Sequence, residues 1–235
     1  QGMPREAERE LTRLLRSGLA VGVATGRGKS VKTALRDAIP KKYWDRIIVG
    51  YYNGGDIGFL GDDTCPDGSD CVSESLRPVA DTIAAHSLLG RFAQFEFRLP
   101  QIKAEPMPGA PADWVLGLLQ QVVLSHADAG VRVLRSSHSM DVLAPGVDKR
   151  DVLVRVAELL GEKTPDGILC VGDMGRYPGN DFLLLSHPLG LSVNEVSQDP
   201  ATCWNIAPAG VRCAGACLEY LRRVKAANGR ARFTL

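Results

Sequence analysis

The sequence has 235 residues, of which 45% are hydrophobic and 23% are charged. A chain of this length can bury a sizeable core, either as one domain with an insertion or as two modest domains. The net charge is +1 and Lys and Arg form no run, so we expect no nucleic-acid partner. The sequence has no stretch of about 18 apolar residues that could span a membrane. We therefore expect a cytoplasmic protein without a membrane partner.

The first quarter of the chain has the pattern of a parallel α/β unit. An amphipathic helix is expected at Glu6–Ser17. Leu19–Ala24 and Ile47–Tyr52 are short apolar runs, which are typical of buried parallel strands. The segment Gly28–Ile39 between them predicts a helix that closes at Pro40. A strand, helix and strand in this order predict a right-handed crossover.

The middle of the chain has a different pattern. Phe92–Leu99 alternates apolar and polar residues, which predicts a strand with one face in water. The order of expected elements is α, β, β, α, β, β, so we expect an antiparallel sheet with two helices on one face. These elements are Pro78–Gly90, Phe92–Leu99, Ile102–Met107, Ala112–Ala127, Val131–Ser136 and Met140–Leu143.

The parallel pattern then resumes. The expected elements are a helix at Asp151–Leu160, a strand at Gly167–Gly172, a short helix at Asp181–Ser186, a strand at Leu189–Val193 and a closing helix at Gly210–Ala227. Arg230–Leu235 is expected to be an edge strand or a tail. The predicted core is therefore discontinuous, with residues 3–56 and 145–235 in the core and residues 57–144 in an inserted domain.

Polar residues follow three of the predicted strands. Thr25, Asn53 and Asp173 each fall at the carboxyl end of a strand, where open parallel sheets bind their ligands. The segment that begins at Thr25 offers a hydroxyl and a helix start for a phosphate, without the spacing of a Walker A loop. Asp173 and Asp181 offer carboxylates for Mg²⁺, and Lys149 offers a cation that would neutralise a phosphate.

These motifs resemble motifs II, III and IV of the haloacid dehalogenase (HAD) superfamily, and the Cof-type and sucrose-phosphate-phosphatase-like branch in particular. The resemblance is carried by Ala24-Thr25-Gly26-Arg27, Tyr52-Asn53-Gly54-Gly55, Ser139–Lys149, Val171-Gly172-Asp173 and Gly179-Asn180-Asp181. It implies a Rossmann-like α/β core of three layers, with a parallel sheet and an inserted α+β (αββαββ) lid of the C2 type. It also implies a magnesium-dependent phosphatase that acts on a phosphosugar or a similar small phosphate ester through an aspartyl-phosphate.

The resemblance also implies roles for single residues. Thr25 and Lys149 would be catalytic, because they would hydrogen-bond and stabilise the phosphate. Arg27, Asn53 and Gly54 would lie in the substrate cleft near the lid. Asp173 would bind magnesium, and Asn180 and Asp181 would support the metal site. Six residues, Met174–Gly179, separate Asp173 from Asn180, more than is usual in the family, so either Asp173 or Asp181 could contact the metal; Asp173 is preferred because it ends the strand.

The sequence departs from the family at one decisive place. The nucleophile of the family is an Asp in a D-x-D-G-T segment that precedes the Thr25 motif, and this sequence contains no such segment. We therefore expect a truncated enzyme that is inactive as it stands and that is completed by an upstream part of the same polypeptide. One alternative is a non-catalytic domain that binds a sugar phosphate and regulates a larger protein, such as a sucrose-phosphate-synthase-like glycosyltransferase. Another is a nucleophile from elsewhere in the chain, but none of the candidates follows an apolar strand in a D-x-D setting; they are Asp56, Asp62, Asp63 and Asp141.

Two of the six cysteines lie together in a loop. Cys65 and Cys71 could close a small ring or supply half of a metal site, but the sequence has no matching second pair of Cys or His. The sequence favours two loop thiols in a reducing compartment.

Overall fold

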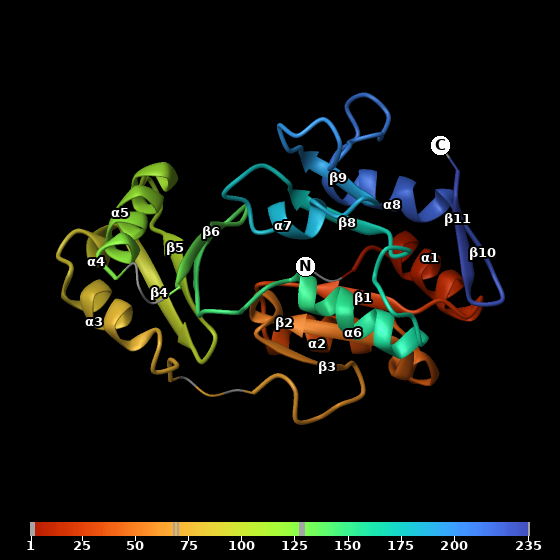
Figure 1. The fold of residues 1–235 in the computed structure, drawn as a ribbon, viewed down its shortest axis with the longest axis horizontal. Coiled ribbons are helices and arrows are strands. Elements are labelled where there is room, and N and C mark those ends of the chain that lie inside the picture. Colours follow the sequence, from red (N-terminus) through yellow and green to blue (C-terminus); the bar gives the residue numbers. More distant parts are fainter. Residues whose placement is uncertain (1–2, 68, 70, 127–129, 235) are drawn as a thin grey trace. The chain divides into compact units, whose positions relative to one another are not determined.

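The computed structural model describes residues 3–67, 69, 71–126 and 130–234, which divide into two compact units (Figure 1). The first unit comprises Gln1–Pro66, Lys149–Tyr177 and Asp181–Leu235, and the second comprises Asp67–Asp148 and Pro178–Asn180. The sequence placed the insertion at residues 57–144. The structure keeps residues 57–66 in the first unit because β3 (Asp56–Phe59) pairs with β2 (Ile47–Tyr51) in antiparallel fashion.

The first unit contains two separate sheets with parallel strand pairs. In one, β1 (Val21–Ala24) is parallel to β2, and β3 adds to the far edge of β2. In the other, β8 (Cys170–Met174) is parallel to β9 (Gly190–Glu195). The helical elements of this unit are α1 (Arg5–Arg16), α2 (Lys29–Ala38), α6 (Arg150–Leu160), α7 (Phe182–Leu185), α8 (Cys213–Arg223) and the 3-10 turns η1 (Lys41–Arg46) and η2 (Tyr52–Gly54).

Helices cover both faces of the β1–β2 pair, which gives three layers. Leu15 of α1 and Leu35 of α2 pack in one cluster with Val49 of β2. Val21 and Val23 of β1 lie on the same face of the sheet and pack against this cluster. On the opposite face, Val152 and Val156 of α6 pack with Ile48. The sheet presents glycines there: a Cβ at Gly22 would lie 3.0 Å from Val152, and a Cβ at Gly50 would overlap the other methyl of Val152.

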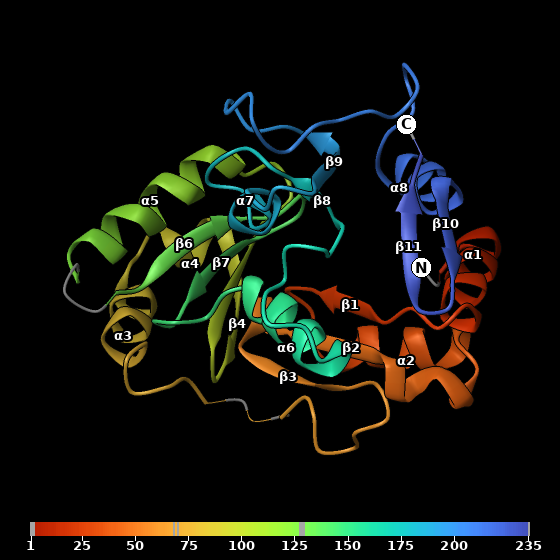
Figure 2. The same ribbon diagram turned by 45° about the vertical axis from the view of Figure 1, so that its right-hand side comes forward.

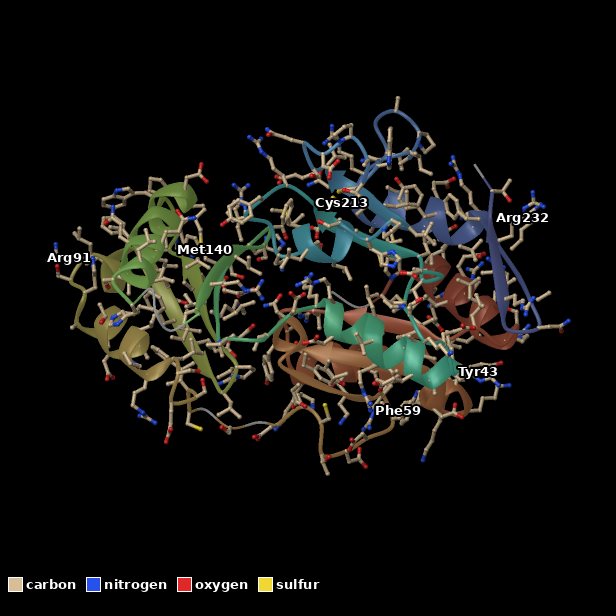
Figure 3. All side chains as sticks on the ribbon, in the orientation of Figure 1. Tyr43, Phe59, Arg91, Met140, Cys213 and Arg232 are labelled. Carbon is tan, nitrogen blue, oxygen red and sulfur yellow. The ribbon has the colours of Figure 1, made fainter. Side chains whose placement is uncertain are left out.

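The second unit is a four-stranded antiparallel sheet with helices, as the alternating pattern predicted. The strand order is β4-β5-β7-β6, and every neighbouring pair is antiparallel. Its buried core includes Met140 of β7, which is 2% exposed and labelled in Figure 3. Its elements are α3 (Arg77–Ala85), α4 (Leu89–Phe92), β4 (Ala93–Arg98), β5 (Gln101–Pro106), α5 (Ala112–Leu124), β6 (Arg132–Arg135) and β7 (Met140–Leu143).

The α/β class with an inserted α+β part is confirmed, and two predicted helices are corrected. The closing helix α8 ends at Arg223, and the residues that follow form an antiparallel hairpin, β10 (Val224–Ala227) and β11 (Arg230–Phe233). The predicted helix Pro78–Gly90 is broken into α3 and α4, since His86 adopts an extended conformation. The antiparallel strand β3 was not predicted. None of the helices in the described ranges has the length and apolarity needed to cross a membrane.

The close packing of α6 on β2 predicts a large effect of one methyl group. We expect Gly50→Ala to lower the free energy of unfolding by about 1–3 kcal/mol, because the new Cβ overlaps the side chain of Val152. The matched control is Gly117→Ala in α5, where no atom lies within 4 Å of the new Cβ. That change should raise the free energy of unfolding by about 0.5–1 kcal/mol, because alanine favours a helix. Urea denaturation measures both, and an equal effect of the two changes would contradict the packing described.

Candidate functional site

Thr25 follows directly after β1 and is fixed by the backbone around it. Its N–H donates to the carbonyl of Gly50 at 2.9 Å, and its carbonyl accepts from the N–H of Asn53 at 2.7 Å. Its hydroxyl oxygen accepts from the N–H of Arg27 at 3.1 Å. A threonine hydroxyl that accepts one hydrogen bond can still donate another. The end of β1 thus presents a positioned hydroxyl group close to the start of α2.

A buried ion pair lies at the end of β8. The ammonium of Lys149, which immediately precedes α6, is 2.7 Å from Oδ1 of Asp181, and both side chains are nearly inaccessible to water. The other oxygen of Asp181 accepts from the backbone N–H groups of Asp173 at 2.9 Å and Met174 at 3.3 Å. Both oxygens of Asp181 are therefore engaged. Asp173, at the carboxyl end of β8, is only partly buried.

The pKa values of the two carboxyl groups, Asp173 and Asp181, shift in opposite directions. Burial, followed by the proximity of Asp181, raises the pKa of Asp173 to about 6. Burial also opposes the ionisation of Asp181, but the positive charge and hydrogen bond of Lys149 outweigh it and lower the pKa of Asp181. Asp181 is thus the permanent anion of the pair, and Asp173 is the group that can change its charge near neutral pH.

Gly172 makes this arrangement possible. A Cβ at Gly172 would lie 2.6 Å from Oδ2 of Asp181, so any side chain there would push the carboxylate off the strand end. We did not assign this role from the sequence. The signal was available, because a glycine inside an apolar strand often marks the close approach of another group.

The long spacing between Asp173 and Asp181 has a structural explanation. Residues 178–180 pair with β6 of the second unit: the N–H of Arg135 donates to the carbonyl of Pro178, and the N–H of Asn180 donates to the carbonyl of Arg135, both at 2.8 Å. The extra residues therefore form a strand-like connection before the chain returns at Asp181. Asn180 belongs to the second unit, whereas Asp173 and Asp181 belong to the first.

The other predicted site residues have distinct environments. Arg27 is exposed, and its Nε lies 3.3 Å from the hydroxyl of Ser30. Asn53 is fully buried with a φ of 61°, and Gly54 has a φ of 92°, so both occupy the left-handed region just after β2. The structure thus brings Asn53 to Thr25 through the backbone, and Lys149, Asp173 and Asp181 together through side chains.

The magnesium ligands expected from the sequence are incomplete. Lys149 and two backbone N–H groups occupy Asp181, which leaves Asp173 as the carboxylate that could contact a cation. Among the described residues, no three His, Cys, Asp or Glu side chains gather closely enough to hold a metal ion. Magnesium is usually bound by one or two carboxylates with water and phosphate oxygens. The residues described supply one of these carboxylates and do not complete a site.

The two loop cysteines are not a pair. Cys65 is buried, and its Sγ lies 3.0 Å from a carboxylate oxygen of Asp56, whereas Cys71 is exposed; neither forms a disulfide. Burial, followed by the hydrogen bond to Asp56, raises the pKa of the Cys65 thiol to about 12. Cys65 therefore serves the core of the first unit.

Solved structures with a similar fold are known. A HAD/COF-like hydrolase from Plasmodium vivax has a TM-score of 0.65, with 14% identity over 93% of this chain and 87% of that chain. A haloacid dehalogenase-like hydrolase from Bacteroides thetaiotaomicron has a TM-score of 0.62, with 14% identity over 94% and 92%. The chain has the haloacid dehalogenase fold. The sucrose-phosphatase of Synechocystis sp. PCC6803, solved in complex with sucrose and phosphate, gives a TM-score of 0.58, with 20% identity over 92% of this chain and 91% of that chain.

The likeness to the HAD fold lies in the three-dimensional structure. No model of a protein family matches the chain, and no curated protein matches it in sequence. The short motifs at the strand ends nevertheless predicted the fold that these structures share with the chain.

The buried ion pair predicts a strong effect on stability. We expect Lys149→Met to lower the free energy of unfolding by about 3–5 kcal/mol, because it leaves Asp181 as a buried, uncompensated carboxylate. The matched control is Arg155→Met in the same helix, which removes an exposed pair with Glu158 and should cost less than about 1 kcal/mol. Chemical denaturation measures the free energy of unfolding of both variants. Similar decreases in the two variants would show that loss of Lys149 does not leave a costly buried carboxylate.

The raised pKa of Asp173 predicts a characteristic dependence of stability on pH. Between pH 3.8 and about pH 6, the folded state binds more protons than the unfolded state, because the pKa of Asp173 is higher in the folded state. The carboxyl group of Asp173 therefore makes the protein less stable as the pH rises through this range. We expect Asp173→Asn to raise the free energy of unfolding by about 1 kcal/mol at about pH 7.5, and to have little effect at about pH 4. Urea denaturation in a chelating buffer measures this, with the exposed Asp37→Asn as the control. A gain that is larger at the acidic pH would contradict the assignment.

Proposed function

We propose that this chain is the greater part of a HAD-type phosphatase that acts on a phosphosugar or a similar small phosphate ester. The observation that carries the proposal is the arrangement of Lys149, Asp181 and Asp173 at the end of β8, with Thr25 at the end of β1 in the same unit. The fold is that of proteins that include a sucrose-phosphatase bound to sucrose and phosphate. This resemblance supports the substrate class without deciding it.

The residues have distinct parts in this proposal. Thr25 donates its hydroxyl hydrogen to a phosphate oxygen, and the N–H of Arg27 holds the hydroxyl in place. Lys149 contributes positive charge at the end of the sheet, and Asp181 keeps that charge in position. Arg27, which is exposed, is available to the part of the ligand that projects into water. The second unit would act as the lid.

Two elements of the reaction lie outside the residues described. The proposed enzyme depends on Mg²⁺, to which Asp173 contributes one carboxylate, and it transfers the phosphoryl group to an aspartate before hydrolysis. Covalent transfer of this kind divides one difficult displacement into two easier ones. Among the described residues, no three His, Cys, Asp or Glu side chains gather to hold a metal ion, and the carboxylate beside Asp173, that of Asp181, is already paired with Lys149. We therefore propose that this chain alone binds phosphate esters weakly and does not turn them over.

The second candidate is a regulatory domain that binds a sugar phosphate without hydrolysing it. The ion pair of Lys149 with Asp181 favours this possibility, because Asp181 holds the Lys149 ammonium group in place without the help of a metal ion. A regulatory domain would bind one sugar phosphate at micromolar concentration without magnesium. A truncated enzyme would bind many phosphate esters poorly.

Calorimetric titration tests these proposals. The ligands are inorganic phosphate, glucose 6-phosphate, sucrose 6-phosphate and free sucrose, each with and without magnesium. We expect weak binding of every phosphate ester and none of free sucrose, and we expect Thr25→Val to weaken binding about tenfold because it removes one hydrogen bond to the anion. The matched control is Thr33→Val on α2, whose hydroxyl donates within the helix to the carbonyl of Lys29.

The outcomes separate the candidates. Tight, magnesium-independent binding of a single sugar phosphate would favour the regulatory domain. Equal binding of sucrose and sucrose 6-phosphate, or no effect of Thr25→Val, would contradict a phosphate site at the end of β1. Magnesium-dependent hydrolysis by this chain alone, abolished by Asp173→Asn, would show that no further nucleophile is needed.

A further inference from the structure

The last two strands of the first unit form a hairpin beside α1 and α8 (Figures 1 and 2). Among the described residues, β10 and β11 pair only with each other, in antiparallel fashion. Asn228 and Gly229 connect them with φ values of 51° and 75°, as in the tight turns that suit the twist of a hairpin. The N–H of Gly229 donates to the carbonyl of Ser17, just after α1, at 2.9 Å. The turn is thus fastened to the rest of the unit.

The two faces of the hairpin differ in character. On one face, Phe233 packs edge-on against Tyr220 of α8, with ring centroids 6.2 Å apart. On the other face, Lys225 is the direct cross-strand partner of Arg232, which is labelled in Figure 3. Arg230 lies on the same face, two residues before Arg232. The side chains of these three cations are exposed, and within the described ranges none of them forms an ion pair.

This row of cations is unfavourable for the folded chain by itself. Like charges directly opposite each other in a sheet destabilise it. Two carboxylates of the neighbouring helices, those of Glu6 in α1 and Glu219 in α8, are both held by Arg222, at 3.4 and 3.0 Å. The hairpin therefore keeps a positively charged face that a partner with the opposite charge would relieve.

The hydrogen-bond register shows which backbone groups of β11 are open. The N–H of Thr234 donates to the carbonyl of Arg223 at 3.3 Å, so the backbone of Arg232, two residues earlier, also faces β10. Ala231 and Phe233 therefore direct their N–H and C=O groups to the other side. In the part of the chain that the structure describes, no backbone group pairs with them there.

The corresponding edge of β10 is already covered. Arg13 of α1 donates to the carbonyl of Val224 at 3.0 Å and to the carbonyl of Leu221 at 2.9 Å. β11 is therefore the strand of this hairpin that can accept another strand. An exposed edge with open N–H and C=O groups is a template for pairing, and charged side chains along it decide which strands can approach.

We propose that the edge of β11 is a docking site for an extended acidic segment of a partner protein, which adds to the hairpin as a third strand. The main chain of this segment pairs antiparallel with Ala231 and Phe233, and its acidic side chains lie opposite Arg230 and Arg232. Because residues on one face of a strand are about 6.8 Å apart, the match requires an acidic residue at every second position. None of the candidate site residues belongs to the hairpin, so this inference is independent of the proposed function.

A protein segment fits this face better than a nucleic acid does. Strand addition uses the open main-chain groups of β11 as well as its charges, and a nucleic acid has no main chain to pair with them. The cationic face also presents no aromatic side chain on which a base could stack; its residues are Lys225, Ala227, Arg230 and Arg232.

Amide hydrogen exchange with a synthetic peptide tests the proposal. The probe is the blocked peptide Thr-Glu-Val-Glu-Val-Glu-Thr, added in excess to the full chain. We expect exchange at Ala231 and Phe233 to slow by about tenfold or more, because these amides become paired inside a three-stranded sheet. One control peptide has proline in place of both valines, which keeps the charge and removes the N–H groups that face β11. Another has lysine in place of every Glu.

Charge reversal in β11 gives a matched test. The double change of Arg230→Glu and Arg232→Glu should weaken binding of the acidic peptide about tenfold or more, and should create binding of the lysine peptide. Arg91→Glu is the control, because Arg91 is an exposed cation of the second unit, labelled in Figure 3. It should leave the binding of both peptides unchanged.

The cost of the cationic face can be measured without any peptide. We expect Arg232→Glu to raise the thermal midpoint by about 1–4 °C, because it replaces a like-charged pair with Lys225 by an opposite-charged one. Arg91→Glu should not raise it. A lower midpoint for Arg232→Glu would contradict a face without counter-charges.

Specific results would overturn the proposal. Unchanged exchange at both amides in excess acidic peptide, or equal protection by the proline or lysine peptide, would exclude strand addition. Equally tight binding of a single-stranded DNA oligonucleotide, lost on the same charge reversal, would assign the face to a nucleic acid instead. Protection of these amides in the chain alone, dependent on protein concentration, would show that a second copy occupies the edge.

Discussion

The contact between Lys149 and Asp181 is the interaction on which the candidate site depends. It links the start of α6, which packs on β1 and β2, to the end of β8. A buried ion pair seldom adds net stability over an apolar pair of the same size, but it holds its partners in one geometry and penalises any other. The fixed pair explains why Asp181 keeps its charge, and burial together with that neighbouring negative charge raises the pKa of Asp173.

The two parallel strand pairs of the first unit belong to separate sheets among the described residues. Helix α6 contributes to clusters on both sheets, through Val152 with Ile48 of β2 and through Leu153 with Cys170 of β8. Within the part of the chain that the structure describes, α6 packs on both sheets, and no backbone pairing joins β1 to β8.

The segment between Asp173 and Asp181 has two structural roles: it pairs with β6 of the second unit, and it leads to the carboxylate that binds Lys149. Its first residues leave the end of β8, its residues 178–180 pair with β6 of the second unit, and its last residue returns as the partner of Lys149. Backbone pairing accepts almost any side chains, so this role leaves little trace in the amino-acid sequence. The spacing alone showed that the segment was unusual, and the hydrogen bonds to Arg135 show what it does.

The sequence by itself determined the elements that local patterns encode. Apolar runs and alternation predicted the parallel and antiparallel strands. Their positions at strand ends indicated Thr25 and Asp173 as site residues, and Lys149 was indicated by its place at the start of a predicted helix. Tertiary structure decided the rest. The antiparallel strand β3, the hairpin after Arg223 and the use of Asp181 as the partner of Lys149 depend on groups that are distant along the chain. A residue type can indicate that a carboxylate is present, but only its neighbours in space decide whether it remains open to a ligand or is already held by an ion pair.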